Sequence, residues 1–297
     1  MNRDLFAASG VGGGVVEATT DPYFNSTTLL LSGDGTNGAQ NNTFIDSSVN
    51  TAAITRSGTP TQGSFSPFSQ TGWSGYFNGT TDYLTTPSSA NTAFSSSTTF
   101  TIDVWVYPTA YALGAGYDSA RTIMSTAYTY PEGWRLDITT TSVTWYTYTN
   151  SSAITTTLIL NKWTHLAVTH DGTTTKLYKD GILVGSAATT WSAGVSSPFY
   201  IGASNAGSYL YPYHGYISNL RITKGVAVYT GNFTPPTTPL TATQAAGTNI
   251  AAITGTATSL LTLQDNRFKD NSTNNFTVSV GSGTPSVQAF SPFAPTA

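Results

Sequence analysis

Hydrophobic and polar residues alternate along several short segments of the chain, with the period of a β-strand. Every second residue from Phe100 to Val106 is apolar, and Thr101 and Asp103 lie between them. Residues 163–170 alternate in the same way. Successive side chains of a strand point to opposite faces, so each segment is expected to place one face in a core.

A β-hairpin is predicted at residues 176–184, where Asp180-Gly181 separates two alternating segments. This dipeptide favours the positive φ angles that a two-residue turn requires. Further strands are predicted at residues 121–125, 134–138, 143–148, 199–201 and 216–222. Many short strands with turns between them indicate an all-β protein, either a sandwich or a jelly roll.

The pattern also divides the chain. Residues 1–28 are Gly-rich and aperiodic, which predicts a flexible N-terminal arm, and residues 29–70 form a leading β segment. The main domain is expected over residues 71–240, because the Pro-rich stretch near its end is unsuited to a central strand. Residues 241–297 are a C-terminal segment.

An internal repeat links the leading and C-terminal segments. Phe44–Asn50, Gly58-Thr59-Pro60 and Phe65-Ser66-Pro67-Phe68 recur in the same order at 268–274, 283–285 and 290–293. We therefore expect residues 29–68 and 260–293 to adopt the same local fold. The second copy also alternates like a strand, and such a strand must pair with something. Pairing with its own domain is the default, and pairing with a neighbouring chain is the alternative.

Five segments resemble laminin-G-like domains, which have the concanavalin A-like jelly-roll fold. The motifs are Gly75–Leu84, Phe100–Pro108, Lys162–Thr169, Leu177–Gly181 and Gly215–Ile222. The resemblance implies a two-sheet antiparallel jelly-roll sandwich. The repeated Phe-Ser-Pro-Phe segments resemble spacers in tandem arrays of tailed-phage and marine bacterial proteins. The fold hosts lectins, hydrolases and structural modules, so it implies no particular ligand.

Composition and charge narrow the partners. Only 8% of residues are charged, the net charge is −3, and the sequence has no Lys/Arg cluster. This argues against nucleic acid and against an anionic membrane surface. No apolar run is long enough for a membrane helix, and the N-terminus lacks a signal-peptide core, so we expect synthesis in a host cytoplasm. A low-charge, Thr- and Gly-rich β-protein without cysteine favours a phage virion protein.

Catalytic residues are not evident. The sequence has two glutamates, Glu17 and Glu132, and Asp103 has no carboxylate two residues away on its strand. Glycosidases need a carboxylate pair, so we expect no enzyme and keep a divergent glycoside hydrolase as the weakest alternative. His165 and His170 are five residues apart and so face opposite sides of a strand, which disfavours a zinc site.

Calcium has one weak candidate loop, residues 32–38, in which Asp34 and Asn37 offer oxygen ligands. A Gly/Asn turn is the favoured interpretation, because a calcium site needs six or more oxygens. No cofactor is therefore expected, with calcium kept as an alternative.

Aromatic residues outside the predicted strands form the candidate glycan site, because aromatic rings stack on sugar faces. An equal alternative is packing between subunits, for which tyrosine is also suited. The tryptophans are expected to pack within the sheets. The candidate residues are Tyr111, Tyr117, Asp118, Tyr128, Tyr130, Tyr209, Tyr211, Tyr213 and His214.

Taken together, the sequence predicts a non-enzymatic phage virion structural protein, such as a capsid decoration, fibre or tail-adhesion subunit. Its expected partners are other virion proteins and further copies of itself in a homo-oligomer, and its expected location is the virion. The main alternative is a carbohydrate-binding module that recognises host-surface glycans.

Overall fold

The computed structural model describes residues 23–31, 46–55, 72–92, 94–112, 120–126, 133–147, 150–188, 190–192, 198–206 and 209–293. Of these, residues 150–153, 205–206 and 209–210 are described by their backbone alone. The calcium candidates Asp34 and Asn37 lie outside this part of the chain. The chain forms two compact units, Met1–Ser66 and Pro67–Ala297, which are described separately.

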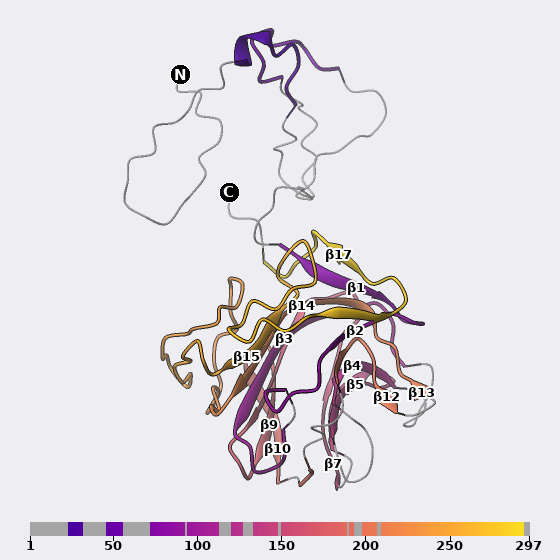
Figure 1. Ribbon diagram of the computed structural model, residues 1–297, viewed down its shortest axis with the longest axis vertical. Helices are drawn as coiled ribbons and strands as arrows, with labels where there is room; N and C mark the ends of the chain where they lie inside the picture. Colours follow the sequence, from indigo (N-terminus) through magenta and orange to yellow (C-terminus); the bar gives the residue numbers. More distant parts are fainter. Residues whose placement is uncertain are drawn as a thin grey trace. The chain divides into compact units, whose positions relative to one another are not determined.

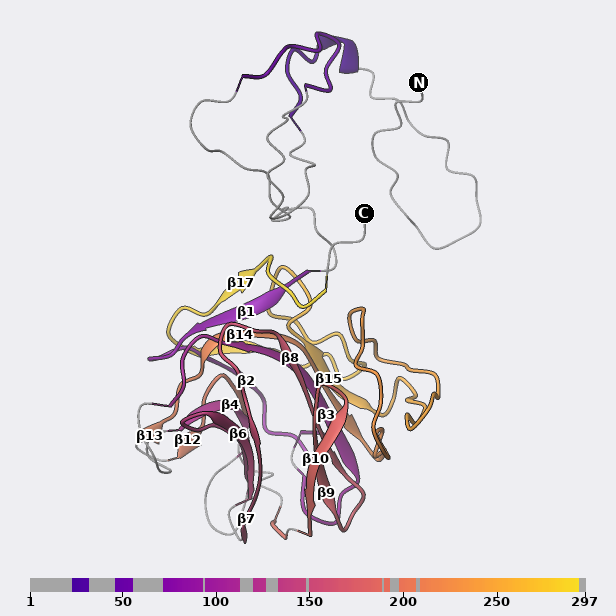
Figure 2. The ribbon, with the colours of Figure 1, turned by 180° about the vertical axis from the view of Figure 1, so that it is seen from behind.

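The second unit is a sandwich of two antiparallel sheets (Figures 1 and 2). Its larger sheet has seven strands in a row, and an eighth, β15 (Thr258–Thr262), pairs with β14. The row is β10 (Ile182–Ala187), β9 (Thr175–Lys179), β8 (Thr164–His170), β3 (Phe100–Pro108), β14 (His214–Lys224), β1 (Ser74–Asn78) and β17 (Ser286–Gln288).

The smaller sheet faces it and has seven strands (Figures 1 and 2). Their order is β16 (Ser279–Ser282), β2 (Tyr83–Thr86), β11 (Phe199–Ile201), β4 (Arg121–Ser125), β5 (Trp134–Ile138), β6 (Ser142–Thr147) and β7 (Asn150–Thr157). A short ribbon pairs β12 (Asn205–Ala206) with β13 (Tyr209–Leu210). The 3₁₀ turn η1 (Phe24–Ser26) is the single helical element of the described residues. The predicted all-β fold is confirmed.

The core lies between the two sheets and is rich in aromatic rings. Trp134 and Trp145 of neighbouring strands stack with ring centroids 4.8 Å apart, and both are fully buried. Phe94 stacks on Phe100 at 4.6 Å. Trp134, Trp145 and Phe100 are inward-facing residues of their strands, as the alternation predicts, and Phe94 lies before β3. No helix of the described residues is long and apolar enough to cross a membrane.

The predicted hairpin is present as β9 and β10. Ile182 pairs with Lys179, and the two turn residues Asp180 and Gly181 have φ angles of 49° and 78°. Positive φ at both positions matches the right-handed twist of the flanking strands. The backbone N–H of Phe233 donates a hydrogen bond to the carbonyl oxygen of Gly181 in this turn, at 2.9 Å.

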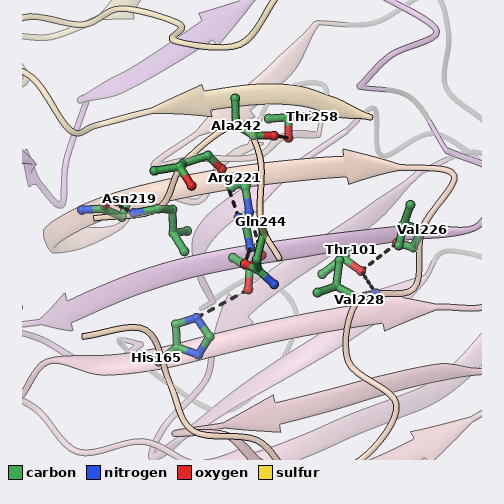
Figure 3. Close-up of polar contacts among 12 residues, drawn as sticks. Thr101, His165, Asn219, Arg221, Val226, Val228, Ala242, Gln244 and Thr258 are labelled. Atoms are coloured by element: carbon green, nitrogen blue, oxygen red, sulfur yellow. Dashed lines mark hydrogen bonds and ion pairs between the residues drawn. The ribbon is translucent and has the colours of Figure 1, made fainter. Parts of the chain in front are cut away.

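The outer face of β3 differs from the sequence expectation. The alternation predicts one face in a core, but Thr101 and Asp103 on the opposite face are also fully buried. The reason is a second layer formed by residues 226–257. The Thr101 hydroxyl donates to the Val226 carbonyl at 2.9 Å and accepts from the Val228 N–H at 2.8 Å (Figure 3). Figure 1 shows this part of the chain on the outside of the larger sheet.

The C-terminal segment packs on its own sandwich, which is the default expectation. β15 pairs with β14, β16 extends the smaller sheet beside β2, and β17 extends the larger sheet beside β1. Phe290 then packs on aromatic rings of the outer face of the larger sheet. We call four residues of this face, Trp105, Tyr107, Trp163 and Tyr216, the aromatic strip. The ring centroid of Phe290 lies 4.9 Å from those of Tyr107 and Tyr216.

The first unit contains a loop organised by one carboxylate, which we call the N-terminal clasp (residues 27–52, described over 27–31 and 46–52). Asp46 Oδ1 accepts the backbone N–H of Leu30 at 3.0 Å and of Ser48 at 2.9 Å. Its Oδ2 accepts the Ser48 hydroxyl at 2.9 Å and the Ala52 N–H at 2.8 Å. These donors hold the pKa of Asp46 well below its usual range.

The C-terminal clasp (residues 258–276) makes the same hydrogen bonds around Asp270. Its Oδ1 accepts the N–H of Leu261 at 3.0 Å and of Ser272 at 2.8 Å. Its Oδ2 accepts the Ser272 hydroxyl at 2.8 Å and the Phe276 N–H at 2.9 Å. The repeated sequence therefore produces a repeated local structure over the described parts of both copies.

Candidate functional site

The outer face of the smaller sheet carries a buried ion pair. In β5 the apolar residues Trp134, Leu136 and Ile138 point into the core, so Arg135 and Asp137 share the opposite face. Arg135 Nη2 lies 2.9 Å from Asp137 Oδ2, and both side chains are fully buried. Charges at such positions require partners, because desolvation is costly.

Three further strands complete the polar floor of this site. The Thr122 hydroxyl of β4 donates to Asp137 Oδ1 at 2.7 Å. On the far side of β5, the Thr144 and Thr155 hydroxyls of β6 and β7 lie 3.2 Å apart. Burial raises the pKa of the Asp137 carboxyl to about 6, while Arg135 and Thr122 act in the opposite direction. Asp137 therefore binds a proton more readily than an exposed aspartate does.

Two tyrosines flank the ion pair. The Arg135 Cζ atom lies 5.0 Å from the ring centroid of Tyr211 and 5.8 Å from that of Tyr146. A guanidinium over a ring face is attracted by the ring quadrupole, so these contacts fix both rings relative to Arg135. Tyr211 is nearly buried, and Tyr146 is half-buried. We call Arg135, Asp137, Tyr146 and Tyr211 the outer-face site.

The sequence-predicted glycan residues are distributed unevenly about this site. Tyr211 belongs to it. Tyr213 is fully buried in the core, where its ring contacts Phe77 and its hydroxyl donates to the Tyr216 carbonyl at 3.1 Å. The Tyr111 hydroxyl donates to the Leu158 carbonyl at 2.8 Å, so this residue braces the turn after β7.

His214 lies at the start of β14, beside Tyr76, with the Tyr76 Oη atom 3.4 Å from its Nε2. Burial and the Arg121 charge lower the pKa of this histidine. Tyr209 is in β13, where the structure describes its backbone alone. The remaining candidates, Tyr117, Asp118, Tyr128 and Tyr130, lie outside the described residues.

Arg135, Asp137 and Tyr146 are not among the sequence candidates. Those candidates are aromatic residues in predicted loops, and these three residues are in strands. A signal is present in Trp134–Ile138, where two opposite charges occupy alternate positions of an otherwise apolar strand. Such charges need a partner or a ligand.

A second charged cluster lies on the outer face of the larger sheet, beneath residues 226–257. Arg221 donates to Asp103 Oδ2 through Nε at 3.1 Å and through Nη2 at 2.9 Å. Arg221 Nη2 also donates to Gln244 Oε1 at 2.9 Å, and His165 Nε2 lies 3.6 Å from Asp103 Oδ1 (Figure 3). These contacts fasten the covering layer to the sheet, so the cluster is structural.

The groups of that cluster shift the pKa values of Asp103 and of the neighbouring Tyr229. Burial alone would raise the pKa of Asp103, but Arg221 and His165 outweigh it and bring it to about 2. Burial and the Asp103 charge raise the pKa of Tyr229. His170 is directed to the other face, where it contacts Phe100 and Trp191, as its spacing from His165 predicts. Among the described residues, no group of three acidic or histidine side chains has the arrangement of a metal site.

Comparison with known proteins agrees with this architecture. A family model described as the concanavalin A-like lectin/glucanases superfamily matches residues 78–227. No curated protein matches the chain. A solved structure with similarity is a putative carbohydrate binding protein from Bacteroides ovatus, at 17% identity and a TM-score of 0.47, over 86% of this chain and 69% of that one.

Two other solved structures are also similar. A pentraxin from Limulus polyphemus has 14% identity and a TM-score of 0.41, over 71% of this chain and 96% of that one. Domain 4 of an extracellular arabinanase from Geobacillus stearothermophilus has 20% identity and a TM-score of 0.39, over 51% and 70%. Identities this low do not bear on ligand or activity. The family model, however, spans just over half of the chain, and the chain therefore belongs to the concanavalin A-like lectin/glucanases superfamily.

Proposed function

We propose that the sandwich is a carbohydrate-binding module, and that its glycan contacts the outer-face site. The observation that carries the proposal is the Arg135–Asp137 ion pair placed between the rings of Tyr146 and Tyr211. A tyrosine ring stacks on the C–H face of a sugar, and its hydroxyl tolerates water. The ion pair beneath is fully buried, so it holds the rings in place without contacting the glycan itself.

The module is proposed to be non-enzymatic. A glycosidase needs two carboxyl groups within about 5–10 Å of each other across the scissile bond. The two fully buried strand carboxylates, Asp103 and Asp137, lie on different sheets, and each is paired with an arginine. Both therefore have structural partners, which supports binding without turnover.

Glycan binding is tested with the full chain on a glycan array, followed by calorimetric titration of the ligands found. Tyr146→Ala is expected to weaken binding at least about fivefold, because one stacked ring contributes on the order of 1–3 kcal/mol. Tyr76→Ala is the matched control, since Tyr76 is also half-buried but belongs to the larger sheet. Equal losses in the two variants, or no glycan bound at millimolar concentration, would contradict the proposal.

A role in a phage particle is the second candidate. The repeated clasp supports it, because a chain whose sequence has a copy of the same element before and after the main domain is suited to serial assembly. The low charge supports subunit contacts as well. Detection of the protein on purified particles, with its copy number, tests this role independently of glycan binding.

A further inference from the structure

The described residues contain one sandwich and two clasps. The C-terminal clasp shows what a clasp does, because its first strand is β15. Within β15, Leu260 and Thr262 are fully buried and pair with Ile222 and Leu220 of β14. The carboxylate of this clasp holds β15 and the following loop in the shape that fits β14.

The N-terminal clasp has the same shape and no such partner strand in the described residues. Residues 27–31 correspond to 258–262, because Leu30 and Leu261 each donate their N–H to the clasp aspartate at 3.0 Å. Leu29 and Leu31, which correspond to Leu260 and Thr262, are 53% and 46% exposed. Two exposed leucines at alternate positions form an apolar edge that soluble proteins usually cover.

We propose that the N-terminal clasp is a docking site for a second sandwich of this fold, one whose closing strand carries no clasp of its own. The C-terminal clasp supplies the register. Leu31 takes the position of Thr262 opposite the residue equivalent to Leu220, and Leu29 takes that of Leu260 opposite the equivalent of Ile222. The inference is independent of glycan binding.

The sandwich of this chain cannot accept the N-terminal clasp while its own clasp is in place. One edge of β14 pairs with β3 along most of its length. The other edge pairs with β1 through residues 214–217 and with β15 through residues 220–223. Both edges of β14 are therefore occupied, and the partner is a sandwich other than the one formed by residues 67–297.

Disulfide trapping tests the docking with full-length chains, and the native sequence contains no cysteine to interfere. The donor carries Thr27→Cys. The acceptor serves as the probe sandwich. It carries Thr223→Cys, at the position that pairs with Thr258. It also carries Asp270→Ala, which loosens its own clasp. Under mild oxidation we expect a mixed-disulfide dimer, at least fivefold more abundant than with Asp46→Ala added to the donor. An acceptor with exposed Thr238→Cys in place of Thr223→Cys is the background control.

The proposal is overturned if the yield does not depend on Asp46, or if the Thr238→Cys acceptor gives the same yield. It is also overturned if a single chain with Thr27→Cys, Thr223→Cys and native Asp270 closes an internal disulfide, because the clasp then docks on its own sandwich. Circular dichroism checks that the acceptor is folded. If Asp270→Ala unfolds the acceptor, Ser272→Ala takes its place, because it removes only the hydroxyl contacts of the clasp. The dimer yields with and without Asp46→Ala in the donor are then compared in the same way.

Discussion

The carboxylate of Asp103 connects β3 to the covering layer of residues 226–257 through Arg221. It is fully buried, and Arg221 and His165 lie beside it. Its pKa is about 2 in the folded protein, below the ordinary value of 3.8. A depressed carboxyl pKa contributes stability that is present above the unfolded value and is lost as the pH falls through the folded value.

Asp103→Asn is expected to lower the free energy of unfolding by about 3–5 kcal/mol at neutral pH, because it leaves the Arg221 charge buried without its partner. Urea unfolding measures the loss. The gap between wild type and variant should be constant above pH 3.8 and should narrow as the pH falls towards 2. Asp171→Asn, at an exposed turn, is the control and should change stability little. A gap that is already absent at pH 7 would show that the ion pair does not hold the layer.

At the same scale, the sequence indicates residue types better than residue roles. It shows that Asp103 has no second carboxylate two residues away, but not that Arg221 and His165 lie beside it. Tyr211 and Tyr213 are two residues apart and look alike in sequence, yet one lies beside Arg135 and the other is in the core. Which face a residue occupies depends on the register of a segment with its neighbours, and that register is a property of the folded sheet.

At the scale of elements, the β9–β10 hairpin shows how turn chemistry limits substitution. Gly181 has a φ of 78°, and a Cβ atom there would overlap the Phe233 carbonyl oxygen. Gly225 has a φ of 86°, and a Cβ atom there would meet no other atom within 4 Å. Both positions require a positive φ angle, but only Gly225 has room for a Cβ atom. The two positions therefore form a matched pair.

Gly225→Ala is expected to cost about 1 kcal/mol, the lower end of the range for a non-glycine residue in a left-handed conformation. Gly181→Ala should cost about 1–3 kcal/mol more, because overlap with fixed backbone is added. Thermal and urea unfolding of both variants measure the difference. Similar losses would mean that the hairpin moves away from Phe233 without cost.

Most strands of the main domain could be predicted from the sequence pattern, and Arg121–Ser125, Trp134–Ile138 and Phe199–Ile201 have the predicted bounds. The pattern does not predict β7, and β1 and β2 are expected only from the family resemblance. β16 overlaps the alternation of the second copy of the repeat, but β15 and β17 could not be placed in the same way. β15 has both faces buried and so lacks alternation. β17 spans three residues, which is too short for a periodic signal. Their positions follow from long-range pairing with β14 and β1.

At the scale of the whole molecule, the aromatic strip holds the segment after β17 on the sandwich. Phe290→Ala is expected to lower the free energy of unfolding of the 67–297 unit by about 2 kcal/mol, less than the 3–5 kcal/mol of a fully buried phenylalanine. The residue contacts Tyr107, Trp163 and Tyr216. Calorimetry measures the change, and Phe24→Ala in the other unit is the control. Unchanged stability would show that Phe290 does not help to hold the segment after β17 on the aromatic strip.

The pairing of β17 with β1 has a consequence for biosynthesis. Ser74 pairs with Gln288, so the first strand of the sandwich must wait for a partner that the ribosome makes long after it. Contacts this distant in sequence slow folding, because a long loop must close before they form. The sandwich therefore completes itself only once Gln288 has left the ribosome. Until then the nascent chain exposes the unpaired edge of β1, and exposed strand edges favour aggregation.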